Sequence, residues 1–566
     1  MSLLEALGDL RHRLEGELFP LEVSGVAEHR RARRELAAQL DDYIVPRLTQ
    51  IDAPLLAVVG GSTGAGKSTL VNSLVGAEVA APGVLRPTTL APTLAVNPGE
   101  LSWFTEQRVL PGLPRVSGSG PEQPGTLRIV AEDTVPAGLA LLDAPDIDSV
   151  VTANRELAAQ LLAAADLWLF VTTSSRYADE VPWGFLRSAS ERSLALAIVL
   201  NRVPAEIMDE VRADLARLLD EHGLSGVPLF GVAELPLTEG RLPPQAVQPI
   251  EGWLAGLAAD EQARDAVVRQ TLSGALTALG TRVPRLADEV DVQLETADAL
   301  RRDVYGAYRR AREQFDDGMR DGSLLRGEVL ARWQEFIGTG EFMRALESRV
   351  GRLRDRIVAV LTGRPAPEAG LAVALETGVE SLIRDSAEQA AERTVDAWSA
   401  RPAGLALLER DGVVAASRLG RASPELKARA GEAVRDWQGF VLTLVRMEGA
   451  GKRTMARVAS FGVNGVGLLL MLLVFAQTAG LSGLEIGIAG GTSVLSQRLL
   501  EAIFGDQAVR QLAAEATRDL RERVGRVFDQ ESVRYTKMVD DLHLDGAGAA
   551  GLRAAAAAVA AASGEL

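Results

Sequence analysis

Residues 55–75 read LLAVVGGSTGAGKSTLVNSLV, an apolar run followed by a glycine-rich loop and a helical pattern. The loop fits the phosphate-binding pattern GxxxxGK[ST], in which backbone N–H groups surround phosphate oxygens. Lys67 is expected to reach the outer phosphates, and the Ser68 hydroxyl to ligate Mg²⁺. The helix that follows directs its positive end at the triphosphate. The predicted nucleotide-binding residues are Gly61, Ser62, Thr63, Gly64, Ala65, Gly66, Lys67, Ser68 and Thr69.

The composition limits the class of protein. With 566 residues and 47% hydrophobic content the chain is long enough for about three domains with buried cores. A net charge of −16 argues against a nucleic-acid partner, which requires a dominant basic face. No cysteine is present, which excludes disulfides and thiolate metal sites, and the four histidines show no ligand spacing. The first residues mix charges into a helical pattern, so no secretory signal is expected and the N-terminus is predicted to be cytoplasmic.

Periodicity divides the chain into segments. Apolar runs alternate with helical segments across 51–248, which predicts a three-layer α/β nucleotide domain. Helices are predicted for 1–50, packing with a helical stalk at 249–457 and a returning stalk helix at 498–545. The alanine-rich tail at 546–566 is expected to be a loosely docked or frayed helix. Besides 55–59, the strands expected are 126–131, 138–142, 166–172, 194–200 and 228–232.

Further candidates for the nucleotide site follow the loop. Thr88 and Thr89 lie in an irregular, proline-containing stretch, where either one would contact Mg²⁺ and the γ-phosphate. Asp143 ends an apolar run and suits an outer partner of Mg²⁺. Asn201 and Arg202 end a later run, at the position of a base-reading loop. Asp and Asn are also common turn formers at strand ends, so a structural role for Asp143 and Asn201 stays open.

Together these motifs resemble the GTPase series and, with helices on both sides, the dynamin family, bacterial dynamin-like proteins in particular. The resemblance implies GTP as the substrate and pairing of two nucleotide domains across the site. Three positions depart from the family pattern: Gly64 replaces a catalytic serine, Asp146 the glycine of DxPG, and Pro204 the aspartate of the base loop. Ile147, after DxPG, fits the family's hydrophobic residue. The Asp146 carboxylate must point away from the γ-phosphate, meet Mg²⁺ or weaken triphosphate sensing.

An apolar segment interrupts the helical half. Residues 458–480 carry no charge, and a helix of that length covers about 35 Å against a hydrocarbon core of ~30 Å. Residues 481–497 continue apolar with one charge, Glu485, and with glycines spaced by four. Basic residues on both sides favour two cytoplasmic ends and anionic lipid headgroups. The segment 458–497 is therefore predicted to be a membrane-binding hairpin or tip, the alternative being a hairpin buried in the helical core.

The sequence thus predicts an α/β P-loop GTPase domain followed by an elongated α-helical stalk with an apolar membrane hairpin. Its predicted function is a dynamin-like GTPase that uses GTP and Mg²⁺ at the cytoplasmic side of the cell membrane, in remodelling or stabilisation. The predicted partners are membrane lipids and a second copy or a related dynamin-like protein, with no nucleic acid. The catalytic candidates are Lys67, Thr88 and Thr89, and the metal candidates are Ser68, Thr88, Thr89 and Asp143.

Two other functions remain open. One is a membrane scaffold that uses nucleotide as an assembly switch and hydrolyses it poorly, which the residues at Gly64, Asp146 and Pro204 favour. The other is an ABC-type ATPase, which the phosphate loop alone would permit. That class needs a glutamate after the strand-end aspartate and an LSGGQ-like signature, whereas Ala144 follows Asp143 and residues 481–485 read LSGLE.

Overall fold

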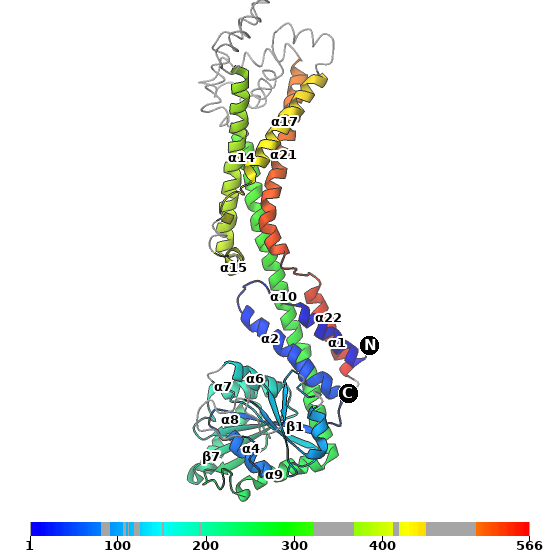
Figure 1. The fold of residues 1–566 in the computed structure, drawn as a ribbon, viewed down its shortest axis with the longest axis vertical. Helices are drawn as coiled ribbons and strands as arrows, with labels where there is room; N and C mark the ends of the chain where they lie inside the picture. Colours follow the sequence, from blue (N-terminus) through cyan, green and yellow to red (C-terminus); the bar gives the residue numbers. More distant parts are fainter. Residues whose placement is uncertain are drawn as a thin grey trace, which may run out of the picture. The chain divides into compact units, whose positions relative to one another are not determined.

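The computed structural model describes residues 2–80, 91–105, 109–110, 112–117, 125–149, 152–191, 194–320, 367–410, 412, 418–448 and 505–564 (Figure 1). Contacts divide the chain into two compact units. The first comprises Met1–Phe19, Gly25–Val292 and Asp545–Leu566, and the second Pro20–Ser24 and Gln293–Leu544. The long helix α10 (Glu261–Arg320) contributes residues to both units.

A mixed eight-stranded sheet forms the centre of the first unit, in the order β3-β4-β2-β5-β1-β6-β7-β8. Neighbouring strands are parallel except β2 and β5, which are antiparallel. The strands are β1 (Leu55–Gly61), β2 (Thr93–Val96), β3 (Arg115–Ser117), β4 (Leu127–Ala131), β5 (Leu139–Asp143), β6 (Leu167–Thr173), β7 (Ala195–Val203) and β8 (Leu229–Ala233). Each of the six expected runs corresponds to one of these strands, whereas β2 and β3 were not expected.

Helices cover both faces of this sheet. Successive side chains of a strand point to opposite faces, and in the central strands the side chains on both faces are apolar. In β1, Leu55, Ala57 and Val59 pack with α4 and α9, whereas Leu56 and Val58 pack with residues of α6, α7 and α8. The result is a three-layer α/β arrangement. The helices of this layer structure are α4 (Lys67–Val75), α5 (Leu101–Thr105), α6 (Thr152–Ala163), α7 (Glu180–Glu191), α8 (Met208–Glu221) and α9 (Pro244–Ala259).

Helices from both ends of the chain join the first unit. They are α1 (Leu3–Gly16), α2 (Val26–Gln39), the π-helical turn Leu40–Ile44, α3 (Val45–Thr49) and α22 (Gly548–Ser563). The alanine-rich tail is a regular helix rather than a frayed one, which corrects the expectation from its composition. Its Leu552 and Val559 are buried where α22 packs on α1, and Arg553 donates to Asp288 and Asp291 of α10 at 2.6 and 2.7 Å. A docked apolar face and these ion pairs therefore hold the tail.

The second unit is helical. It contains the end of α10 with α14 (Pro367–Ser399), α15 (Pro402–Glu409), α17 (Leu426–Glu448) and α21 (Asp506–Asp540) around one apolar core. Two fully buried indoles tie helices together through backbone carbonyls. Trp398 Nε1 donates to Leu300 O at 3.1 Å, and Trp437 Nε1 donates to Ala516 O at 2.8 Å. Pairing each polar indole atom lets both rings be buried without an unmet donor.

The stability of the second unit is expected to fall above pH ~10, because burial raises the pKa of the phenols of Tyr308 and Tyr535. With raised pKa values in the folded state, the unfolded chain loses these protons first as pH rises, so unfolding becomes more favourable by up to about 1.4 kcal/mol per pH unit for each tyrosine. Urea unfolding at a series of alkaline pH values measures this slope. In the variant Tyr308→Phe, the free energy of unfolding is expected to fall less steeply with pH. An unchanged slope would contradict a raised pKa of Tyr308 in the folded state.

Among the described residues, no helix has the length and apolar content needed to cross a bilayer. The predicted hairpin at 458–497 lies outside those residues. Its association with membrane therefore stays a prediction from the sequence.

Candidate nucleotide site

Glycines fix the backbone of the phosphate-binding loop between β1 and α4. Gly61 has a φ of +152°, and a Cβ there would lie 2.0 Å from the carbonyl oxygen of Val171 on the neighbouring strand β6. Gly66 has a φ of +85°, and a Cβ there would lie 2.7 Å from Nδ2 of Asn201. A larger residue at either position would have to displace backbone or the Asn201 amide. The backbone conformation of the loop is therefore restricted by its close contacts with β6 and β7.

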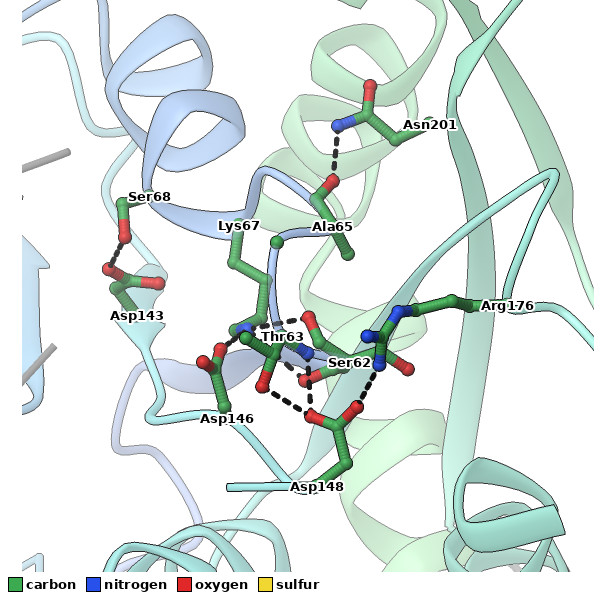
Figure 2. Close-up of polar contacts among 12 residues, drawn as sticks. Ser62, Thr63, Ala65, Lys67, Ser68, Asp143, Asp146, Asp148, Arg176 and Asn201 are labelled. Carbon is green, nitrogen blue, oxygen red and sulfur yellow. Dashed lines mark hydrogen bonds and ion pairs between the residues drawn. The ribbon is translucent and has the colours of Figure 1, made fainter. Parts of the chain in front are cut away.

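Lys67, the first residue of α4, is 5% exposed and is held on three sides. Its Nζ donates to the carbonyl oxygens of Gly61 at 3.1 Å and Ser62 at 3.2 Å, and it forms a short ion pair with Asp146 (Figure 2). The structure therefore has the Asp146 carboxylate turned to Lys67, a partner that the sequence did not indicate. An anion already contacts the cation that a triphosphate would need.

Ser68 and Asp143 form the second polar pair of the site. Asp143 ends β5 and is fully buried, and its Oδ2 accepts a hydrogen bond from Ser68 Oγ at 2.6 Å (Figure 2). Hydroxyl and carboxylate oxygens are the ligand types that Mg²⁺ prefers. The donor set therefore fits a magnesium ion bound directly by Ser68, with Asp143 as an outer partner. Among the described residues, no group of three or more His, Cys, Asp or Glu side chains is placed to hold a metal ion.

The remaining predicted phosphate contacts are described only in part. Thr69 lies in the first turn of α4, where its carbonyl accepts a hydrogen bond from Ser73 Oγ at 2.6 Å. The predicted switch threonines, Thr88 and Thr89, lie in residues 81–90, outside the described residues. Their contact with Mg²⁺ or the γ-phosphate stays a prediction.

The predicted base loop contacts the phosphate loop. Asn201 Nδ2 donates to Ala65 O at 2.7 Å, and Arg202 Nη1 donates to Gly64 O at 3.1 Å. Arg202 has a φ of +56°, an uncommon conformation for a residue with a side chain. Its guanidinium also lies 3.7 Å from Oε1 of Glu234, just after β8. Asn201 and Arg202 therefore lie beside the phosphate loop, within the last residues of β7 rather than in a loop after it, and Glu234 brings a carboxylate to the same place. Their contact with a base stays a prediction.

Two further residues join the site that the motifs did not indicate. Asp148 Oδ1 accepts hydrogen bonds from both the backbone N–H and the Oγ1 of Thr63, each at 2.6 Å. Arg176, after β6, donates to Asp148 Oδ2 at 2.5 Å (Figure 2). The acidic run Asp143, Asp146, Asp148 is a signal that could have indicated Asp148. No local pattern marks Arg176, because the sheet brings it to the loop from a distant part of the sequence.

Comparison with solved structures adds a likeness in fold. Two structures match the chain, both described as an oligomerised bacterial dynamin pair that provides a mechanism for the long-range sensing and tethering of membranes. One is 11% identical with a TM-score of 0.42 and covers 100% of this chain and 95% of that chain. The other is 11% identical with a TM-score of 0.41 and covers 99% and 95%. The chain resembles bacterial dynamins. This is the family that the motifs indicated.

A further solved structure matches a smaller part of the chain. A structure of Aquifex aeolicus Era bound to GDP and AlF₄⁻ is 19% identical with a TM-score of 0.24, and it covers 36% of this chain and 57% of that chain. No protein-family model and no curated protein matches the chain. At these identities and TM-scores the likeness to bacterial dynamins carries no argument about function, which is argued from the geometry of the site.

Proposed function

We propose that the chain is a dynamin-like GTPase that binds GTP and Mg²⁺ and acts at the inner face of a bacterial membrane. The observation that carries the nucleotide part is that the buried Lys67 and the hydrogen-bonded Ser68–Asp143 pair both lie where the parallel strands β1 and β5 end. A buried lysine, a hydroxyl and a strand-end carboxylate at the ends of parallel strands are the groups that triphosphate and magnesium require.

In this function the residues of the chain act mainly by position and charge. Lys67 neutralises charge that develops on the γ-phosphoryl group, while the loop amides hold the phosphates in line with an attacking water. Mg²⁺, when bound, would supply positive charge that offsets part of the negative charge of the phosphates. Ser68, Asp143 and one of the threonines at 88 and 89 would hold it. Asn201 and Arg202 hold the end of β7 against the phosphate loop, beside the position expected for the base.

The second candidate function is a membrane scaffold that binds nucleotide and hydrolyses it slowly. One observation favours it, the Lys67–Asp146 ion pair, because the carboxylate competes with phosphate oxygens for the same cation. Gly64 adds no side chain to the loop where the family carries a serine. Binding and turnover therefore have to be measured separately.

The membrane part of the proposal rests on the sequence of 458–497, with its uncharged first arm and basic flanks. Lipids are the proposed partner of this segment. A second copy of the chain, or a related dynamin-like chain, is the proposed protein partner. The structures with which the chain shares its fold likeness are described as an oligomerised pair that tethers membranes, which is consistent with both partners.

The experiment measures GTP and ATP turnover by the purified full-length chain, with and without vesicles of anionic lipid. We expect GTP turnover that vesicles stimulate. In Lys67→Ala we expect turnover to fall about a hundredfold or more, because that variant lacks the cationic side chain that contacts the phosphates. Deletion of 458–497 is expected to keep basal turnover and lose the stimulation. Lys427→Ala, an exposed lysine of α17, is the matched control.

The outcomes separate the candidates. Nucleotide-dependent vesicle binding without turnover would support the scaffold instead of the enzyme. ATP turnover in preference to GTP would contradict the guanine part of the proposal. Equal nucleotide binding by the wild type and Lys67→Ala would contradict the assignment of residues 61–68 as the phosphate-binding loop.

A further inference from the structure

Arg176 belongs to a turn that is firmly held. The turn follows β6, and the backbone N–H groups of Arg176 and Tyr177 both donate to Thr173 O, at 3.1 and 3.0 Å. The Tyr177 hydroxyl donates to Asp214 Oδ2 of α8 at 2.8 Å, and Trp183 Nε1 of α7 donates to Tyr177 O at 3.0 Å. The base of the Arg176 side chain is therefore positioned by the sheet and by two helices.

The carboxylate of Asp148 links the guanidinium of Arg176 to the phosphate loop. Asp148 accepts from Arg176 through Oδ2 and from Thr63 through Oδ1 (Figure 2). Thr63 follows Ser62, whose carbonyl accepts from Lys67 Nζ. The Asp148 side chain is 14% exposed and that of Arg176 36%, so the guanidinium lies at the rim of the site with room to turn.

The charges around the loop favour a second cation for the phosphates. Three carboxylates, Asp143, Asp146 and Asp148, lie there, and Asp146 is paired with Lys67 and Asp148 with Arg176. Among the described residues of the loop and of 143–149, Lys67 is the sole cationic side chain. Hydrolysis spreads negative charge over the γ-phosphoryl oxygens, and a planar guanidinium donates to two such oxygens at once.

We propose that Arg176 is a catalytic arginine that acts within the same chain. When GTP binds, its guanidinium leaves Asp148 for the γ-phosphoryl oxygens, and Asp148 keeps its bonds to Thr63. The proposal deepens the proposed GTPase function and rests on it. It assigns to this chain a cation that would otherwise come from a partner protein.

The reaction itself is a simple hydrolysis. The water oxygen forms a new bond to the γ-phosphorus, and the bond from that phosphorus to the β–γ bridging oxygen breaks. The electron pair stays on the bridging oxygen of GDP. One proton of the water stays on the attacking oxygen, and the other goes to a second oxygen of the inorganic phosphate. Arg176 forms no covalent bond and contributes by stabilising charge that is greatest in the transition state.

The test compares single-turnover GTP hydrolysis in the full-length wild type, Arg176→Ala and Arg176→Lys. Arg176→Ala is expected to hydrolyse GTP about 10³-fold more slowly, because arginines of this kind contribute ~10³–10⁵ to kcat. Its GTP affinity, measured with a fluorescent GTP analogue, is expected to stay within about threefold, because the contact forms mainly in the transition state. Arg176→Lys is expected to bind like the wild type and to hydrolyse at least about thirtyfold more slowly, because it lacks the bidentate fork.

A second readout does not depend on turnover. The wild type is expected to capture fluorescent GDP together with AlF₄⁻, which imitates the transferring phosphoryl group, and both Arg176 variants are expected to lose this capture. Arg187→Ala, an exposed arginine of α7, is the matched control. Turnover and AlF₄⁻ capture by Arg176→Lys equal to those of the wild type would overturn the role of Arg176 and leave the GTPase function intact. A wild type that binds GTP without hydrolysing it would instead overturn both.

Discussion

Replacing Asp146 with asparagine is expected to raise the affinity for GTP by about ten- to a thousandfold. The carboxylate is almost buried and paired with Lys67, the cation that a triphosphate must use. Two like charges about 4 Å apart repel by ~4 kcal/mol at an intermediate dielectric, which corresponds to about three powers of ten in affinity. The amide keeps the shape of the side chain and removes the charge.

The measurement is a titration of wild type and Asp146→Asn with GTP and GDP in the presence of Mg²⁺. Asp133→Asn, an exposed aspartate between β4 and β5, changes the net charge by the same amount and is the matched control. We expect a larger gain for GTP than for GDP, because the competition is for the outer phosphate. Weaker GTP binding by Asp146→Asn would show that the carboxylate assists the nucleotide, as a magnesium ligand would.

Removing Asp166 is expected to destabilise the first unit by about 3–5 kcal/mol, the usual cost of leaving a buried charge without its partner. Asp166 precedes β6 and is 3% exposed, and its Oδ2 accepts from Leu56 N at 2.8 Å and pairs with Arg47 Nη2 at 3.0 Å. Arg47 also donates to Ala53 O at 3.0 Å. Asp166→Ala therefore leaves an arginine of α3 and a strand N–H of β1 without their carboxylate.

Chemical unfolding of the full-length chain, followed by circular dichroism, measures this loss. Glu35→Ala is the control, because it breaks the ion pair with Arg282 in the same unit, where the two side chains are 50% and 28% exposed, and we expect less than about 1 kcal/mol. The double variant Arg47→Met with Asp166→Leu is expected to recover most of the loss by replacing the ion pair with apolar contact. A loss of less than about 1 kcal/mol in Asp166→Ala would contradict the structural importance of this pair.

The parts of the fold that the sequence predicted are those with local periodicity. Strands such as β1 and β6 are continuous apolar runs bounded by turn residues, which is why buried parallel strands can be located. β2 and β3 have four and three residues, too short to show a pattern. The tail helix α22 was misjudged, because composition gives its helical propensity but not the surfaces of α1 and α10 on which it packs.

The site divides in the same way. Lys67, Ser68 and Asp143 belong to motifs whose spacing follows from phosphate and magnesium chemistry, so the sequence places them together. The direction of the Asp146 side chain was not predictable, because the same sequence is compatible with a carboxylate that pairs with Lys67 and with one that points to solvent. Arg176 reaches the loop only through the parallel register of β6 with β1. Such pairings depend on tertiary structure.

The most direct test of the central claim, that the loop at 61–68 binds a nucleoside triphosphate through Lys67, is calorimetric titration of the full-length chain with a slowly hydrolysed GTP analogue and Mg²⁺. The account predicts saturable binding at one site per chain, lost in Lys67→Ala and strengthened in Asp146→Asn. Equal heats of binding for the wild type and Lys67→Ala, or none for either, would contradict it.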